Sequence, residues 1–165
     1  MTSVTIGSGV TSIGYGEFAW CGGLTSITIP DSVTSIEDSA FLNCTGLTSL
    51  KIGSGLTSIG SSVFENCTGL TSIIIPDSLI SIESNAFRGC MSLTSLKIGS
   101  GLTNIGNYAF SNCSALTSVT FENTTGWYLA ASSSETTGDS INVTNASTNA
   151  TNLKSTYTSK YWNRS

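Results

Sequence analysis

The sequence repeats the motif Phe-x-x-Cys at a constant interval of 23 residues, and this interval restricts the fold more than any other feature does. The motif starts at Phe18, Phe41, Phe64, Phe87 and Phe110. Aligning the copies gives five units, numbered here in chain order, that begin at residues 1, 24, 47, 70 and 93, and a partial sixth unit from residue 116. Units of this length bury their apolar side only against their neighbours, so the period predicts a solenoid with one continuous core.

Unit 2, residues 24–46, shows the elements expected in each turn of the solenoid. "LTSITI" predicts a strand, because Ile27 and Ile29 are two residues apart and therefore lie on one face. "PDS", or "GSG" in other units, is a turn sequence, "VTSI" predicts a second short strand, and "SAFLNC" predicts a tight helical turn. Equivalent positions of paired strands lie about 4.8 Å apart. We therefore predict an internal column of phenylalanines with the cysteines beside it.

A slower rhythm of 46 residues is superimposed on the repeat. Units with "IPDS" alternate with units that carry "IGSG", and Lys51 and Lys97 occur two units apart. Like charges directly opposite each other on neighbouring strands are destabilising, so this spacing separates them. Duplication of a two-unit block explains the rhythm equally well, and the sequence leaves both explanations open.

The unit L-x-x-I-x-I-P-x-x-V-x-x-I-x-x-x-A-F-x-x-C resembles the leucine-rich repeats of BspA-like bacterial surface proteins, over residues 1 to about 121. The resemblance implies a right-handed leucine-rich-repeat superhelix with a parallel β-sheet on the concave side and short strands and helical turns on the convex side. It also implies a secreted or cell-surface protein that attaches to host extracellular matrix proteins or to other surface proteins. It carries over no catalytic residues.

The polar residues offer little for catalysis or metal binding. His is absent and the cysteines are always 23 residues apart, whereas zinc sites need closely spaced ligands. We therefore predict buried structural thiols, with no metal and no cofactor. Without a His base or a phosphate-binding loop, we do not expect an enzyme. The six basic residues are scattered and the net charge is −4, unlike the clustered basic footprint of a nucleic-acid-binding protein.

The strand at the start of each unit offers the best candidate for a binding surface. Alternation turns Ile27 and Ile29 inward and leaves Ser26 and Thr28 outward. The column that contains Thr28 changes from unit to unit within a nearly constant frame, as a recognition surface does, although hydroxyl-rich strands are also simply soluble β-formers. The predicted binding residues are Thr5, Thr28, Lys51, Ile74, Lys97, Thr120, Ser49, Ser72 and Ser95.

Residues 122–165 depart from the repeat, and we predict that they form a C-terminal capping segment next to an array of residues 1–121. Solenoids need such a cover for the open end of their core. Extended segments are expected at residues 126–130 and 140–143, and Trp127, Tyr128 and Trp162 are expected to pack in the cap rather than stack on sugars. A helix capped by Asn145 is predicted from the spacing of Ala146, Ala150, Leu153, Tyr157 and Tyr161.

The sequence therefore predicts non-enzymatic protein recognition or adhesion at a bacterial cell surface through the concave sheet. A structural spacer that holds another domain away from the cell is the first alternative, and a glycan-binding module is the second. The N-terminus, "MTSVTIGSGV", lacks the pattern of a signal peptide. Because the units are few and the chain starts at a unit boundary, we expect it to be a piece of a longer array.

Overall fold

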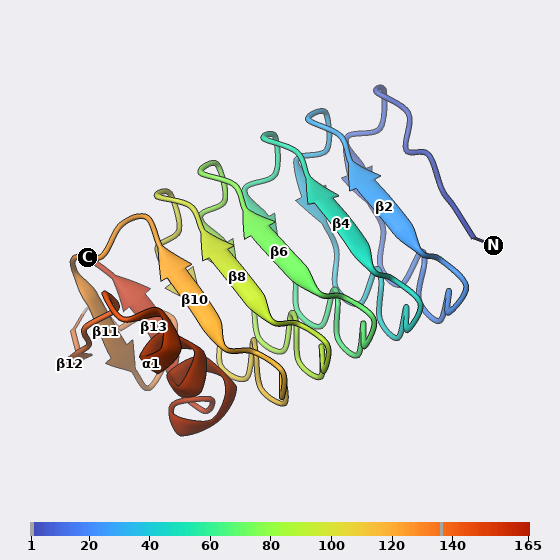
Figure 1. Ribbon diagram of the computed structural model, residues 1–165. Helices are drawn as coiled ribbons and strands as arrows, with labels where there is room; N and C mark the ends of the chain where they lie inside the picture. Colours follow the sequence, from blue (N-terminus) through green and yellow to red (C-terminus); the bar gives the residue numbers. More distant parts are fainter. Residues whose placement is uncertain (1, 136) are drawn as a thin grey trace.

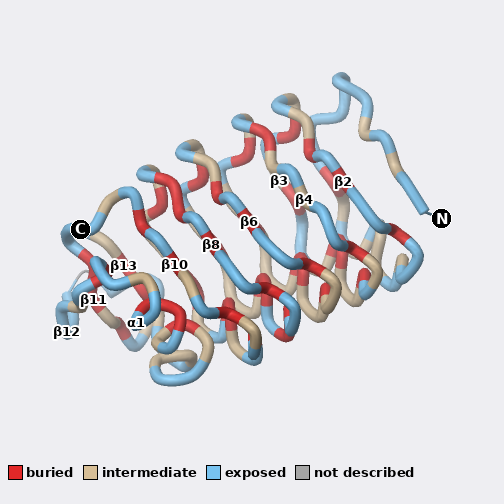
Figure 2. Tube along the Cα trace, in the orientation of Figure 1, coloured by how far each residue is buried: buried red, intermediate tan, exposed pale blue. Residues whose placement is uncertain are grey.

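The structure, a computed structural model, describes residues 2–135 and 137–165 and is a solenoid in which each unit forms one turn (Figure 1). The front of the solenoid carries a series of four-residue strands that lie side by side: β2 (Ser26–Ile29), β4 (Ser49–Ile52), β6 (Ser72–Ile75), β8 (Ser95–Ile98) and β10 (Ser118–Phe121). Their residues alternate as predicted, with Ser26 and Thr28 exposed and Ile27 and Ile29 buried (Figure 2). We call the outward side chains of this series the strand face.

A second series of strands runs along the back of the solenoid: β1 (Ser12–Ile13), β3 (Ser35–Ile36), β5 (Ser58–Ile59), β7 (Ser81–Ile82) and β9 (Asn104–Ile105). These strands pair in parallel without interruption, each one with the strand of the next unit. The front series is interrupted, because β2 pairs with β4, and β6 pairs with β8 and β8 with β10, in two separate sheets.

The segments that contain Phe-x-x-Cys are turns with two left-handed residues each, so the chain does not continue as a helix. In unit 2 these residues are Ser39 at φ 59° and Asn43 at φ 58°. The equivalent residues of the other units are Gly16, Trp20, Ser62, Asn66, Asn85, Gly89, Tyr108 and Asn112. Asn and Gly tolerate this conformation better than other residues, which accounts for their frequency at these positions. Backbone hydrogen bonds then run to the next unit, as from Phe18 N to Ala40 O at 2.8 Å.

The core contains the predicted column of phenylalanines. Consecutive rings are stacked with centroids 5.1 to 5.3 Å apart and interplanar angles of 6 to 13°. Each cysteine thiol from unit 2 onward donates to the carbonyl of the Phe in the preceding unit, and Cys44 Sγ lies 3.1 Å from Phe18 O. Burial raises the pKa of Cys44 to about 11, so the thiol stays a protonated donor. The motif therefore supplies a stacked ring and a hydrogen bond to the neighbouring unit.

The C-terminal residues cover the end of the core with β11 (Trp127–Ala130), β12 (Asp139–Ser140), α1 (Ala146–Thr151), the π-helix η1 (Asn152–Thr156) and β13 (Tyr161–Arg164). β13 pairs antiparallel with β9 and β11, which extends the back sheet. Trp162 is buried and stacks on Phe121 with ring centroids 6.3 Å apart. The side chain of Asn145 caps α1, as predicted, by accepting from Thr148 N.

Two details of the C-terminal prediction are wrong. The helical spacing predicted a helix that includes Tyr161, but this residue lies in β13. The extended segment at 140–143 is a strand only at its start, since β12 ends at Ser140. The first difference arises because pairing of β13 with β9 buries Trp162, whereas the helix propensity of this Ser- and Thr-rich segment is weak.

Candidate functional site

All nine predicted binding residues are exposed, and they lie on or next to the front strands. Thr28 lies opposite Lys51 in the β2–β4 pair, and Ile74 and Thr120 both lie opposite Lys97 in the sheet of β6, β8 and β10. Ile74 is 68% exposed, whereas large apolar side chains elsewhere on these strands point into the core. The structure thus brings the residues together on one face, and their role in binding stays a prediction.

Lys97 is engaged in an ion pair, which the sequence did not predict. Its Nζ lies 2.5 Å from Oε1 of Glu122, in the unit that departs from the repeat. The hydrogen bond from Lys97 and the negative charge of Glu122 raise the pKa of Lys97. Lys51 forms no such ion pair within residues 2–135 and 137–165, so the two lysines are not equivalent. The patch around Ile74 therefore has one neutralised and one available positive charge.

The junction between units 2 and 3, and that between units 4 and 5, are closed by complementary turns. Asp31 Oδ1 accepts from the backbone N–H of Ser54 at 2.7 Å, and Asp77 Oδ1 accepts from that of Ser100 at 2.7 Å. These hydrogen bonds lower the pKa of both carboxyl groups. A Cβ atom added to Gly101 would lie 1.8 Å from Asp77 O, so the last glycine of "GSG" is required by the "PDS" turn beside it. This fit gives the 46-residue rhythm a structural reason that the sequence did not reveal.

The junction between units 3 and 4 is open at the front. Within the part of the chain that the structure describes, no backbone hydrogen bond joins β4 to β6. Thr48 N donates to Thr25 O at 2.9 Å, and Thr94 N donates to Thr71 O at the same distance. Thr71 N has no such bond to Thr48 O. The opening is confined to the front, because β5 pairs with β7 directly behind it.

The opening exposes part of the core. Leu50 and Ile52, which turn inward from β4, are only half-buried. The equivalent residues of the other four strands in this series are buried. The loss of burial coincides with the loss of backbone pairing on this side of β4.

A proline removes one of the possible front hydrogen bonds at the open junction. At the junctions between units 4 and 5 and between units 5 and 6, the residue that follows the front strand donates its N–H to the preceding unit. Gly99 N donates to Ile75 O at 3.0 Å, and Glu122 N donates to Ile98 O at 2.9 Å. The equivalent donor for Ile52 O is position 76, where proline has no N–H. Pro30 has the same position relative to Ile6. A proline that follows the strand therefore removes this bond to the preceding unit.

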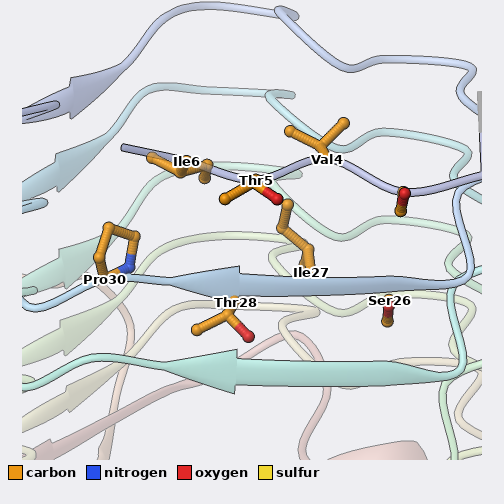
Figure 3. A pocket seen from close by; sticks show the side chains of 8 residues that line it. Val4, Thr5, Ile6, Ser26, Ile27, Thr28 and Pro30 are labelled. Carbon is orange, nitrogen blue, oxygen red and sulfur yellow. The ribbon is translucent and has the colours of Figure 1, made fainter. Parts of the chain in front are cut away.

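Each proline borders a hollow between two units. The hollow between units 3 and 4 has a volume of about 270 Å³ and is lined by Leu50, Lys51, Ile52, Ser72, Ile74 and Pro76. The hollow between units 1 and 2 has a volume of about 330 Å³ (Figure 3). Six of its lining residues stand at the equivalent positions, Val4, Thr5, Ile6, Ser26, Thr28 and Pro30, and Ser3 and Ile27 line it as well. Five of the predicted binding residues, Thr5, Thr28, Lys51, Ser72 and Ile74, line one of these hollows. Neither hollow was predicted from the sequence, although both prolines are present in it.

The tryptophans of the C-terminal segment are not placed for glycan binding. Trp127 and Trp162 are buried, so their faces are not available to stack on a sugar. In the described residues, no cluster of three or more His, Cys, Asp or Glu side chains is placed to hold a metal ion. No described helix has both the length and the apolar character needed to cross a membrane.

Comparison with known families identifies the repeat. The family described as "BspA type Leucine rich repeat region" matches in six copies, over residues 1–117 and 35–157. The chain belongs to the BspA-type leucine-rich repeat family. This match and the solenoid together confirm the resemblance that the repeat motif indicated. Leucine-rich repeats are non-enzymatic binding modules in general, and the family indicates no catalytic activity.

Several solved structures are similar to this BspA-type chain. A leucine rich cell surface protein from Faecalibacterium prausnitzii is 38% identical, with a TM-score of 0.73 over 76% of this chain and 33% of that chain. A leucine-rich repeat protein from T. pallidum is 33% identical, with a TM-score of 0.65 over 67% of this chain and 51% of that chain. One from Eubacterium ventriosum is 33% identical, with a TM-score of 0.67 over 70% of this chain and 32% of that chain.

The present chain thus spans about a third to a half of the length of these similar structures. A search of curated proteins gave no significant match.

Proposed function

We propose that this chain recognises other proteins at the surface of a bacterial cell through its strand face. The observation that carries the proposal is the exposed column around Ile74, which varies between units while the frame around it stays constant. The family and the cell-surface relative from Faecalibacterium prausnitzii support it. Solenoids commonly bind partners on an extended face of this kind.

The patch formed by Lys51, Ile74 and Lys97 favours a partner with apolar and acidic groups. Covering an exposed Ile side chain contributes about 1.5 to 3 kcal/mol to association. Lys51 lies beside Ile74 in the adjacent hollow, and Lys97 lies opposite it in the β6–β8 pair. Because Lys97 is already paired with Glu122, Lys51 is the stronger determinant of charge selectivity. Rim charges of this kind act mainly on association rate and on salt dependence.

The test measures binding of the purified chain to immobilised host matrix proteins by interferometry, at low and at physiological salt. Three variants run in parallel with it: Lys51→Glu, Ile74→Asp and Lys97→Gln. Glutamine is used at position 97 because a Glu there would repel Glu122 and disturb the fold. Lys160→Glu, an exposed lysine of the C-terminal segment, is the charge-matched control.

Saturable binding that falls at least about ten-fold in Lys51→Glu and Ile74→Asp, and is unchanged in Lys160→Glu, supports recognition by the strand face. Binding that all variants retain contradicts the proposed face. Absence of binding by the unsubstituted chain across the panel contradicts the proposal for this chain and favours the spacer alternative.

A further inference from the structure

We propose that the hollow between units 3 and 4 is a recognition slot for an extended peptide segment of a partner protein, one that carries an apolar side chain next to a carboxylate. This inference rests on the proposed function and defines the chemistry of the partner. We call the hollow lined by Leu50, Lys51, Ile52, Ser72, Ile74 and Pro76 the slot. Its backbone, its lining and its charge each point to such a segment.

The front backbone is unpaired along the slot. β4 and β6 face each other across it without the ladder that joins the other neighbouring front strands. Their Cα atoms stay within 8 Å of each other, so a partner strand does not fit between them and the partner reaches the slot with a side chain. A segment that lies extended over the front strands turns alternate side chains toward the chain, so that one enters the slot.

The lining selects an apolar side chain. Leu50 and Ile52 show part of their surface to the slot, and Ile74 and Pro76 border it. The volume of about 270 Å³ is below the range of roughly 300 to 1,000 Å³ that is typical of small-molecule pockets. The slot thus suits one anchoring side chain of a longer segment.

The charge at the rim selects a carboxylate next to that anchor. Lys51 lines the slot and forms no ion pair with the residues described. The charge of Lys51 acts weakly on the carboxylate of Asp31, which accepts the N–H of Ser54. A partner carboxylate beside Lys51 therefore gains an attraction that no ion pair within the described residues takes up.

The hollow between units 1 and 2 is a natural control for the slot. It has the same position relative to its proline, but Thr5 and Thr28 stand where the slot has Lys51 and Ile74. It lacks the lysine and the exposed Ile, so we expect it not to select an acidic apolar segment. A substitution in the hollow between units 1 and 2 therefore shows how such a change affects the fold while the slot stays intact.

The test measures fluorescence polarisation of a labelled heptapeptide with the sequence Gly-Ser-Asp-Leu-Asp-Ser-Gly against the whole chain. One control peptide has Asn in place of both Asp residues, and another has Ala in place of Leu. Pro76→Ala restores a backbone N–H at the position from which the equivalent residues bond the preceding unit, so it is designed to close the slot. Pro30→Ala makes the same change at the other hollow.

We expect saturable binding of the acidic peptide, at least about ten-fold weaker in Pro76→Ala because burial of the Leu side chain is lost. Lys51→Ala is expected to weaken binding about five-fold, as for a surface ion pair, and to abolish the difference between the acidic and the Asn peptide. Pro30→Ala and Lys160→Glu are expected to bind within about two-fold of the unsubstituted chain. Circular dichroism and melting curves establish that each variant is folded.

The inference is overturned if the peptide does not bind at millimolar concentration, or if Pro76→Ala and Pro30→Ala bind it equally well. Binding to a matrix protein that depends on Ile74 but not on Pro76 supports the proposed function and contradicts the slot. Peptide binding that Pro76→Ala abolishes, without binding to any matrix protein, supports the slot and contradicts the proposed function.

Discussion

The junctions between units 2 and 3 and between units 3 and 4 are built from the same 23-residue frame, yet one is closed and the other is open at the front. In the closed junction, four residues of β2 pair with four of β4, and Asp31 holds the next turn. In the open junction these contacts are absent among the described residues, while the back strands and the phenylalanine column continue. The comparison shows that the back of the solenoid holds the units together and the front is free to vary.

The two junctions also differ in the order of their turns. When "PDS" precedes "GSG", the Asp and the small glycines fit together; when "GSG" precedes "PDS", the proline has no N–H to offer. In this chain a hollow lies at each of the two junctions where "GSG" precedes "PDS". The front of the solenoid changes there while the phenylalanine column continues.

The largest expected effect is a loss of stability when the phenylalanine column is interrupted between units 3 and 4. Phe87 stacks on Phe64 at 5.3 Å behind the open junction and is fully buried. Phe87→Ala is expected to lower the free energy of unfolding by about 3 to 5 kcal/mol, because it leaves a cavity. Chemical denaturation measures this, with the exposed Ile74→Ala expected to stay within about 0.5 kcal/mol. A small loss for Phe87→Ala contradicts the role assigned to the back.

The second prediction concerns the fit of a closed junction. Gly101→Ala places a Cβ against Asp77 O and is expected to cost about 1 to 3 kcal/mol through overpacking. Gly9→Ala is the matched control, since the equivalent position in unit 1 has no atom within 4 Å of an added Cβ. Melting temperatures of the two variants check the prediction. Equal losses at both positions are incompatible with complementary turns.

A smaller effect concerns pH. Hydrogen bonding by Ser100 lowers the pKa of Asp77 from its ordinary value of 3.8, so this carboxylate stabilises the fold above that pH, and the contribution is lost as pH falls through the lower, folded value. Asp77→Asn is therefore expected to melt at a lower temperature at pH 7 and to lose less stability between pH 5 and pH 2. Asp139→Asn, at an exposed position of β12, is the control. Parallel pH profiles for Asp77→Asn and the unsubstituted chain contradict the closed-junction account.

Much of the fold was predictable because the repeat fixes it. The spacing of Ile27, Ile29 and Phe41 determines which side chains face the core, and the structure confirms the strands and the column. The predicted binding residues are exposed for the same reason, since alternation along a strand leaves no other orientation.

The sequence did not predict features that arise between units or outside the repeat. The ion pair of Lys97 requires Glu122, which stands where earlier units have Gly or Pro. The need for Gly101 comes from the backbone of Asp77, a contact between residues of different units. The open junction was indicated by Pro76, but its meaning depends on the hydrogen bond that the neighbouring units make at that position.

The most direct test of the open junction is amide hydrogen exchange at three equivalent positions, Thr48, Thr71 and Thr94, followed by NMR. Thr48 N and Thr94 N each donate to the preceding unit at 2.9 Å, whereas Thr71 N faces the open junction. A net hydrogen bond of about 0.5 to 1.5 kcal/mol predicts exchange at Thr71 that is faster by about two- to ten-fold. Equal protection at the three positions would mean that β4 and β6 pair in solution, and it would contradict the open junction.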